Sequence, residues 1–96
     1  MALNGMPERG APVEVHLDRD EDVLYISLGS PVASHVDEKP GGILLRWADA
    51  GNQPTGVTAL HFRGHWRDRL PEFSSLVADH LNVSDKLIEA AVRRVM

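Results

Sequence analysis

Ten consecutive residues, from His61 to Leu70, concentrate the side chains of this sequence that could bind a ligand or do chemistry. The segment HFRGHWRDRL holds three arginines, two histidines and two aromatic residues against one acid. Tryptophan and arginine are enriched where proteins bind other proteins, because each offers a large and preorganised contact surface. The same mixture can stack on nucleic-acid bases and pair with phosphates. The candidate binding residues in this segment are Arg63, His65, Trp66, Arg67 and Arg69.

Three interpretations of this segment stay open. In the first, it is the contact surface for a small protein partner or for a second copy of the chain. In the second, it binds nucleic acid through Arg63, Trp66, Arg67 and Arg69. In the third, Phe62 and Trp66 seal a junction between sheet and helices while the arginines pair with the acidic N-terminal half of the chain. The formal net charge of −4 repels phosphate backbones, so we prefer a protein partner over nucleic acid.

Two histidines of the segment raise the question of a metal site. His61 and His65 stand four residues apart, a spacing that on a helix puts two imidazoles on one face. Gly64 lies between them and His61 closes a predicted strand, so we do not expect helical geometry here. A small metal-dependent enzyme that uses His61 and His65 is therefore an alternative hypothesis, and the preferred interpretation has no metal and no cofactor.

The acidic run Asp18, Asp20 and Asp22 has the spacing that opens a calcium-binding loop. The sixth and twelfth positions of such a loop would be Val23 and Gly29, where glycine and glutamate are needed, so we interpret the run as a hairpin turn. The sequence contains no motif of a hydrolase or of a phosphate-binding loop, and we therefore expect no catalytic residues. It also contains no cysteine, which excludes disulfides and fits a cytoplasmic protein.

The elements that must position these residues follow from hydrophobic periodicity. Up to Phe62 apolar residues alternate with polar ones, the period of two that is typical of strands, and turn-forming residues separate the runs. Short polar connections indicate an antiparallel meander. Strands are predicted at 13–18, 23–28, 32–36, 43–48 and 56–62, the third as an edge strand. One face of this sheet is expected to carry Tyr25 and Trp47, which we add to the candidate binding residues.

Beyond Phe62 the apolar residues recur with the helical period. Pro71 suits the first turn of a helix, and Asn82 is expected to end that helix in a left-handed conformation. Ser84 is the expected N-cap of a second helix. The predicted fold class is therefore α+β, a four- to five-stranded antiparallel β-meander followed by two C-terminal helices packed on one sheet face. Residues 13–96 are expected to form a single domain behind a flexible N-terminal arm, residues 1–12.

The first predicted hairpin resembles a known family. The stretch LDRDEDVLYISL, which starts at Leu17, is similar to the opening Y-D-x-E-x-D-x-L-Y-I-x-L of the prokaryotic domain-of-unknown-function family 2283. The pair Val36-Asp37, the strand GILL from Gly42 and the pair Gly56-Val57 are similar to the acidic turn and to two later strands of that family. The resemblance covers roughly residues 13–62, and Leu17 stands where the family has tyrosine. The family has no established catalytic residues, and some members look like partners of small toxin-like proteins.

These observations favour a small non-enzymatic interaction module. Hydrophobic residues make up 43% of the chain and charged residues 25%, so the composition is that of an ordinary globular domain. No apolar run approaches the roughly 20 residues of a membrane span. A domain this small buries a modest core, and a second copy would add to the surface it can bury. We expect a bacterial, cytoplasmic homodimer or partner-binding protein, and the resemblance implies a regulatory or antitoxin-like role.

Overall fold

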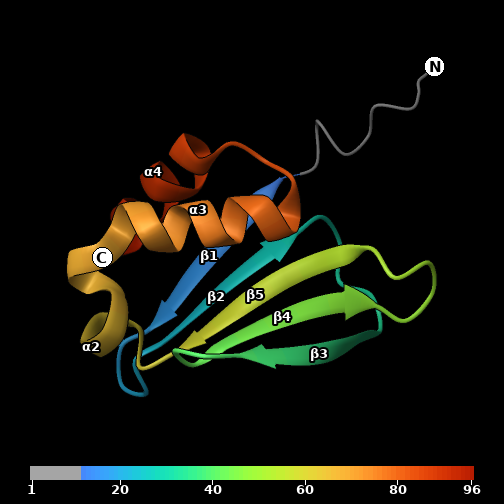
Figure 1. Ribbon diagram of the computed structural model, residues 1–96, viewed down its shortest axis with the longest axis horizontal. Helices are drawn as coiled ribbons and strands as arrows, with labels where there is room; N and C mark the ends of the chain where they lie inside the picture. Colours follow the sequence, from blue (N-terminus) through green and yellow to red (C-terminus); the bar gives the residue numbers. More distant parts are fainter. Residues whose placement is uncertain (1–11) are drawn as a thin grey trace.

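The strands come first along the chain and the helices follow, in the computed structural model, which describes residues 12–96 (Figure 1). The predicted N-terminal arm, except for Pro12, lies outside the described residues. The strands are β1 Val13–Asp18, β2 Val23–Leu28, β3 Ser34–Lys39, β4 Ile43–Ala48 and β5 Pro54–Leu60. The helices are α2 Phe62–Trp66, the 3₁₀ turn η1 Arg67–Arg69, α3 Leu70–Leu81 and α4 Asp85–Val95. The predicted α+β class is confirmed.

All five strands form one antiparallel sheet, with the order β1-β2-β5-β4-β3. Strands β3, β4 and β5 are a three-stranded meander, and β5 then returns to pair with β2 of the first hairpin. The sheet therefore departs from strictly sequential order at one point, because β2 and β3 are not neighbours. This order leaves β1 and β3 as the two edge strands (Figure 1).

The core lies between one face of the sheet and the helices. Cross-strand neighbours on this face are Leu24 with Ala59 and Ile26 with Val57, and all four are fully buried. Their alternation along each strand is the period of two that the sequence shows. Helices α3 and α4 lie over this face and complete the core (Figure 1). The helical residues buried there include Phe73, Val77, Ile88 and Val92.

Local residue chemistry sets the helix ends. Asn82 adopts a left-handed conformation with φ 59° at the end of α3, and Pro71 lies in its first turn, both as predicted. The Ser84 hydroxyl accepts a hydrogen bond from the Leu87 amide of α4 at 3.4 Å, so the predicted N-cap is confirmed. Among residues 12–96 no helix is both long and apolar enough to cross a membrane.

Two strands have boundaries that differ from the predicted ones. Strand β3 runs from 34 to 39 rather than from 32 to 36, and β5 runs from 54 to 60 rather than from 56 to 62. The early end of β5 has a local cause: His61 adopts a left-handed conformation with φ 51°, which turns the chain out of the sheet. Phe62 then begins helix α2 instead of ending a strand.

On the sheet face opposite the helices, the Arg46 side chain reaches across one strand. Its Nη2 donates to the Ile26 carbonyl oxygen at 2.8 Å and contacts the Ser27 hydroxyl at 3.3 Å, although Arg46 is on β4 and its acceptors are on β2. The guanidinium therefore passes over Gly56 of the intervening strand β5. A Cβ at Gly56 would collide with this guanidinium and would lie 2.5 Å from the Ile26 carbonyl oxygen. Only glycine fits beneath Arg46.

We predict that Gly56→Ala lowers the free energy of unfolding by about 2 kcal/mol, because the added methyl group must displace the guanidinium or the backbone of β2. Urea denaturation followed by circular dichroism measures the change. Gly64→Ala is the matched control, since a Cβ there meets no atom within 4 Å and alanine favours a helix. Equal stability of the Gly56→Ala and wild-type proteins would show that the position of the Arg46 guanidinium does not require a glycine at residue 56.

Candidate binding groove

In the structure, residues 61–70 connect the last strand of the sheet to helix α3. Phe62, Trp66 and Leu70 are four residues apart and all are buried, with at most 5% of each side chain exposed. The Trp66 indole packs on Phe73, and its Nε1 donates to the Gly41 carbonyl oxygen at 3.2 Å. Most of the Trp66 ring is therefore enclosed by the protein itself rather than offered to a partner.

Arg63 binds the acidic turn of the first hairpin. Its Nε donates to the Asp22 carboxylate at 2.8 Å, and its Nη2 donates to the Arg19 carbonyl oxygen at 2.7 Å. The same carboxylate accepts from the backbone amides of Arg63 and Gly64, so it also caps the first turn of α2. Burial raises the pKa of the Asp22 carboxyl, but the hydrogen bonds from Arg63 and Gly64 outweigh it and hold the pKa below its usual value.

The other predicted binding residues of the segment divide into two groups. Arg69 makes two hydrogen bonds to the Glu72 carboxylate, at 2.8 and 3.1 Å, and its guanidinium lies 4.5 Å from the centre of a Trp66 ring. Arg67 and His65 are exposed, and within residues 12–96 neither forms an ion pair. Two of the three arginines are thus paired with acids of the chain, Arg63 in a part-buried pair and Arg69 in an exposed one, and Arg67 has no such partner among the described residues.

His61 and His65 do have the helical relation that we did not expect from the sequence. Gly64 lies inside helix α2, and the His65 amide donates to the His61 carbonyl oxygen at 3.0 Å. The helix forms because Phe62 and Trp66 bury their rings on one side of it, which outweighs the low helix propensity of glycine. The ring centroids lie 6.2 Å apart. The part of the chain that the structure describes holds no group of three or more His, Asp or Glu residues arranged for a metal ion.

We predict that Asp22→Asn lowers the free energy of unfolding by about 1.5 kcal/mol at pH 7, because the charge-assisted bond to Arg63 is lost. Asparagine tolerates the left-handed conformation of residue 22, φ 57°, so the substitution isolates the charge. The folded pKa lies below the unfolded value of 3.8, so the stabilisation is complete above that value and disappears as pH falls through the folded pKa.

Urea denaturation of both proteins across the range from pH 2 to pH 7 measures this difference. Glu21→Gln is the matched control, because Glu21 is an exposed neighbour of Asp22 in the same turn. A stability difference between Asp22→Asn and wild type that persists unchanged at the lowest pH would show that the carboxylate charge is not its cause.

Tyr25 and Trp47 lie on opposite faces of the sheet, which corrects the prediction that they share one. The strand register places Leu45 beside Val57 and Val57 beside Ile26, and Ile26 and Val57 belong to the core, so Leu45 faces the helices. Trp47 follows Leu45 by two residues on β4 and faces the same side, where it contacts His80 of α3. Tyr25 follows Leu24 and points the other way, 40% exposed. The alternation within each strand was correct, but sequence alone does not reveal how two strands are phased against each other.

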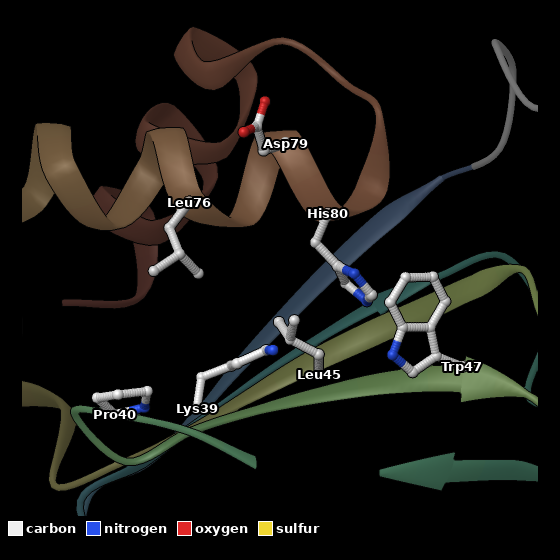
Figure 2. Close-up of a pocket in the computed structure, with 7 residues that line it drawn as sticks. All are labelled: Lys39, Pro40, Leu45, Trp47, Leu76, Asp79 and His80. Carbon is white, nitrogen blue, oxygen red and sulfur yellow. The ribbon is translucent and has the colours of Figure 1, made fainter. Parts of the chain in front are cut away.

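The helices cover only part of their face of the sheet. Helix α4 packs on β1 and α3 packs on β5, whereas β4 and β3 extend beyond them (Figure 1). An open groove of about 580 Å³ lies between α3 and these two strands. Leu76 and His80 reach into it from the helix, above the side chains of the strands (Figure 2). The groove is lined by Lys39, Pro40, Leu45, Trp47, Leu76, Asp79 and His80.

His80 and Trp47 form the aromatic end of the groove (Figure 2). Their rings meet edge to face, with centroids 4.5 Å apart. His80 Nε2 lies 3.1 Å from the Arg46 carbonyl oxygen, and since a carbonyl can only accept, Nε2 is assigned the proton. Burial lowers the pKa of His80, so the imidazole is neutral at pH 7 and its Nδ1 is an acceptor. This end of the groove is therefore aromatic and uncharged.

The groove is lined by two charged residues, Lys39 and Asp79. Lys39 Nζ is 3.2 Å from the Asp37 carboxylate, so its charge is already balanced. Asp79 is exposed on the rim formed by α3, points away from the strands, and forms no ion pair within residues 12–96 (Figure 2). Leu45 on β4 and Leu76 on α3 provide apolar surface on opposite sides of the groove. This arrangement can hold an apolar side chain and offers one free negative charge beside it.

Sequence reasoning found Trp47 but missed the rest of this groove. Leu76 belongs to the apolar residues that recur with the helical period after Phe62, yet it is only half-buried, because the strands that it faces extend past the helix. His80 lies four residues after Leu76, on the same side of the helix, which was the available signal. No family model, curated protein or solved structure matches this chain significantly. The resemblance to domain-of-unknown-function family 2283 stays a prediction.

Proposed function

We propose that this protein is a small non-enzymatic interaction module that binds an amphipathic helix of a partner protein in the groove between α3 and strands β3 and β4. A regulatory or antitoxin-like role is the specific form that the family resemblance implies. The observation that carries the proposal is the incomplete helical layer, which leaves Leu45, Trp47 and Leu76 half-buried on the core side of the sheet. Homodimerisation and a cytoplasmic location belong to the same proposal.

The width of the uncovered strip supports a helix as the occupant. Neighbouring strands lie about 4.8 Å apart, so β4 and β3 together expose a strip roughly 10 Å wide. An α-helix with its side chains is about 10 Å across. An antiparallel sheet buries one face against a layer of helices, and here that layer stops at α3. One additional helix beside α3 would complete it.

The side chains of the groove favour the same kind of partner. Amphipathic helices bind by placing an apolar stripe in a hydrophobic groove, with anchors one turn apart. Trp47 is a suitable hot-spot residue because its large ring is already held by an edge-to-face contact with His80. Leu45 and Leu76 provide apolar surface on the two sides of the groove. A leucine or aromatic anchor from a partner helix would contact all three.

Charge favours a basic partner helix. Asp79 stands on the rim where the flank of a neighbouring helix would pass, and it forms no ion pair among the described residues. The chain as a whole carries −4, and residues 1–40 hold eight acids against three bases, which gives −5 there. A lysine or arginine beside the apolar stripe of the partner would therefore be attracted.

The two alternative functions have less support from the geometry. A nucleic-acid site was predicted to use Arg63, Trp66, Arg67 and Arg69. Two of these arginines, Arg63 and Arg69, are bound to acids and Trp66 is buried, which leaves Arg67 as the one exposed member without an ion pair among the described residues. A metal-dependent enzyme would rest on His61 and His65 alone among the described residues. Retention on nucleic acid at low salt, and metal analysis of protein purified without a histidine tag, would test these alternatives.

We predict that a 14-residue amphipathic peptide of leucine and lysine binds this protein saturably and shifts the emission of Trp47 to shorter wavelength, because the indole loses water. Trp66→Phe makes Trp47 the single tryptophan, and circular dichroism checks that this variant is folded. A peptide of leucine and glutamate with the same pattern should bind at least about tenfold more weakly, because Asp79 and the net charge repel it.

Leu76→Lys places a charge in the groove and should weaken binding of the leucine–lysine peptide by about tenfold or more. Ser75→Lys adds the same charge to the next position of α3, where the side chain is exposed, and serves as the matched control. Equal binding by the two lysine variants would contradict the groove as the binding site. Absence of saturable binding by either peptide would contradict the proposed partner.

A further inference from the structure

Strand β3 leaves one edge of the sheet open (Figure 1). It pairs with β4 on one side, and within residues 12–96 no element pairs with its other side. Five of its six residues are exposed, and Val36 at its centre is 54% exposed. Such an edge presents unpaired backbone groups to any strand that can align with it.

The hydrogen-bond pattern shows which backbone groups face outward. The Asp49 amide donates to the Ala33 carbonyl oxygen at 2.9 Å, so Ala33 and Asp49 are a hydrogen-bonded pair at the start of the β3–β4 register. In an antiparallel ladder such pairs alternate with pairs that are not hydrogen-bonded to each other. The residues whose N–H and C=O groups point away from β4 are therefore Ser34, Val36 and Glu38.

The sequence of β3 is complementary to itself in one antiparallel register. With Val36 opposite Val36 of a second copy, Ser34 lies opposite Glu38, and His35 lies opposite Asp37, each twice by symmetry. All three outward-facing residues then pair. A shift by two residues in one direction would place Asp37 opposite Asp37, and a shift in the other would place His35 opposite His35. The first shift puts two carboxylates directly opposite each other, which is unfavourable, and the second loses both His35–Asp37 pairs, so the register centred on Val36 is preferred.

The present partners of these side chains do not prevent this pairing. Asp37 contacts Lys39, and His35 contacts Asp49, but both pairs are about half exposed and are therefore weak. The other edge strand, β1, is less accessible, because α4 packs on it and Arg19 at its end is bonded to the carbonyl oxygens of Val95 and Met96. The open side of the sheet is thus the side of β3.

We infer that two copies of this chain associate through their β3 strands, antiparallel and with Val36 on the two-fold axis, to form one continuous sheet. The inference rests on the self-association part of the proposed function, for which it names the surface, and it does not depend on the groove. A second copy is the occupant that the self-complementary order of Ser34, His35, Val36, Asp37 and Glu38 fits.

Single cysteines test the register directly, because the chain contains no cysteine of its own. In the inferred dimer the two Cα atoms of residue 36 lie about 5.5 Å apart, within reach of a disulfide. Residue 38 of one copy lies opposite residue 34 of the other, so the two copies of residue 38 are separated by four residues along the strand, roughly 13 Å, which is too far for a disulfide. Under mild oxidation Val36→Cys should form a disulfide-linked dimer at least about tenfold faster than Glu38→Cys, an equally accessible control on the same strand.

A mixture of Ser34→Cys and Glu38→Cys should give mainly the mixed dimer, because these positions face each other in the inferred register. Sedimentation equilibrium of the wild-type chain should show dimers, and Asp37→Lys should weaken them about tenfold, since lysine would then face His35 twice. A wild-type monomer at all accessible concentrations would overturn both self-association and this interface. A dimer in which Val36→Cys crosslinks no faster than Glu38→Cys would overturn the β3 interface alone.

Discussion

The arrangement of the sheet and the helices depends on the hydrogen bonds that the Asp22 carboxylate accepts. This carboxylate joins the turn of the first hairpin to the first turn of α2 through one side-chain and three backbone hydrogen bonds, all from Arg63 and Gly64. The Asp22 carbonyl oxygen also accepts from the Phe62 amide at 3.0 Å. The chain therefore leaves β5 and enters the helical layer at one fixed point. From that point Phe62 and Trp66 enter the core, and α3 starts at Leu70 in a direction that leads it over β5 and not over β4.

A second contact, at Arg46, fixes the other end of α3. The register between β4 and β5 shifts at Arg46 and Trp47, and such a bulge frees backbone groups from the ladder. The Arg46 carbonyl oxygen is bonded to His80 of α3, while its guanidinium lies on the opposite face of the sheet over Gly56. Arg46 thus anchors α3 through its carbonyl oxygen, and its guanidinium covers Gly56 on the opposite face of the sheet. The groove exists because α3 is held at both ends, and its neighbours β4 and β3 have no helix of their own among the described residues.

Much of this fold could be predicted from the sequence, because its strands and helices are local consequences of periodicity and of single residues such as Asn82 and Ser84. What could not be predicted depends on contacts between distant segments. Strand order could not be predicted, because the alternation of apolar and polar residues in a strand does not depend on which strand is its neighbour. For the same reason Trp47 was placed on the same face as Tyr25, whereas it lies on the face that the helices cover. Helix α2 was missed because it is five residues long and contains a glycine, and because the contacts that hold it, the burial of Phe62 and Trp66 and the cap from Asp22, involve distant residues. The candidate site changed accordingly, from the arginines of residues 61–70 to a groove whose residues come from β3, β4 and α3.

The two proposed surfaces are adjacent, and their chemistry explains why they would remain separate. The row His35, Asp37 and Lys39 faces the same side of the sheet as the groove and lies between the apolar residues of β4 and the open edge of β3. If two copies joined at β3, these polar residues would form a central strip with one groove on each side of the two-fold axis. Polar side chains in such a strip are poor contacts for an apolar stripe, so each groove would take its own helix rather than share one across the axis. Dimerisation would then bring two partner-binding sites onto one rigid sheet, and a partner with two linked helices would bind more tightly than one with a single helix.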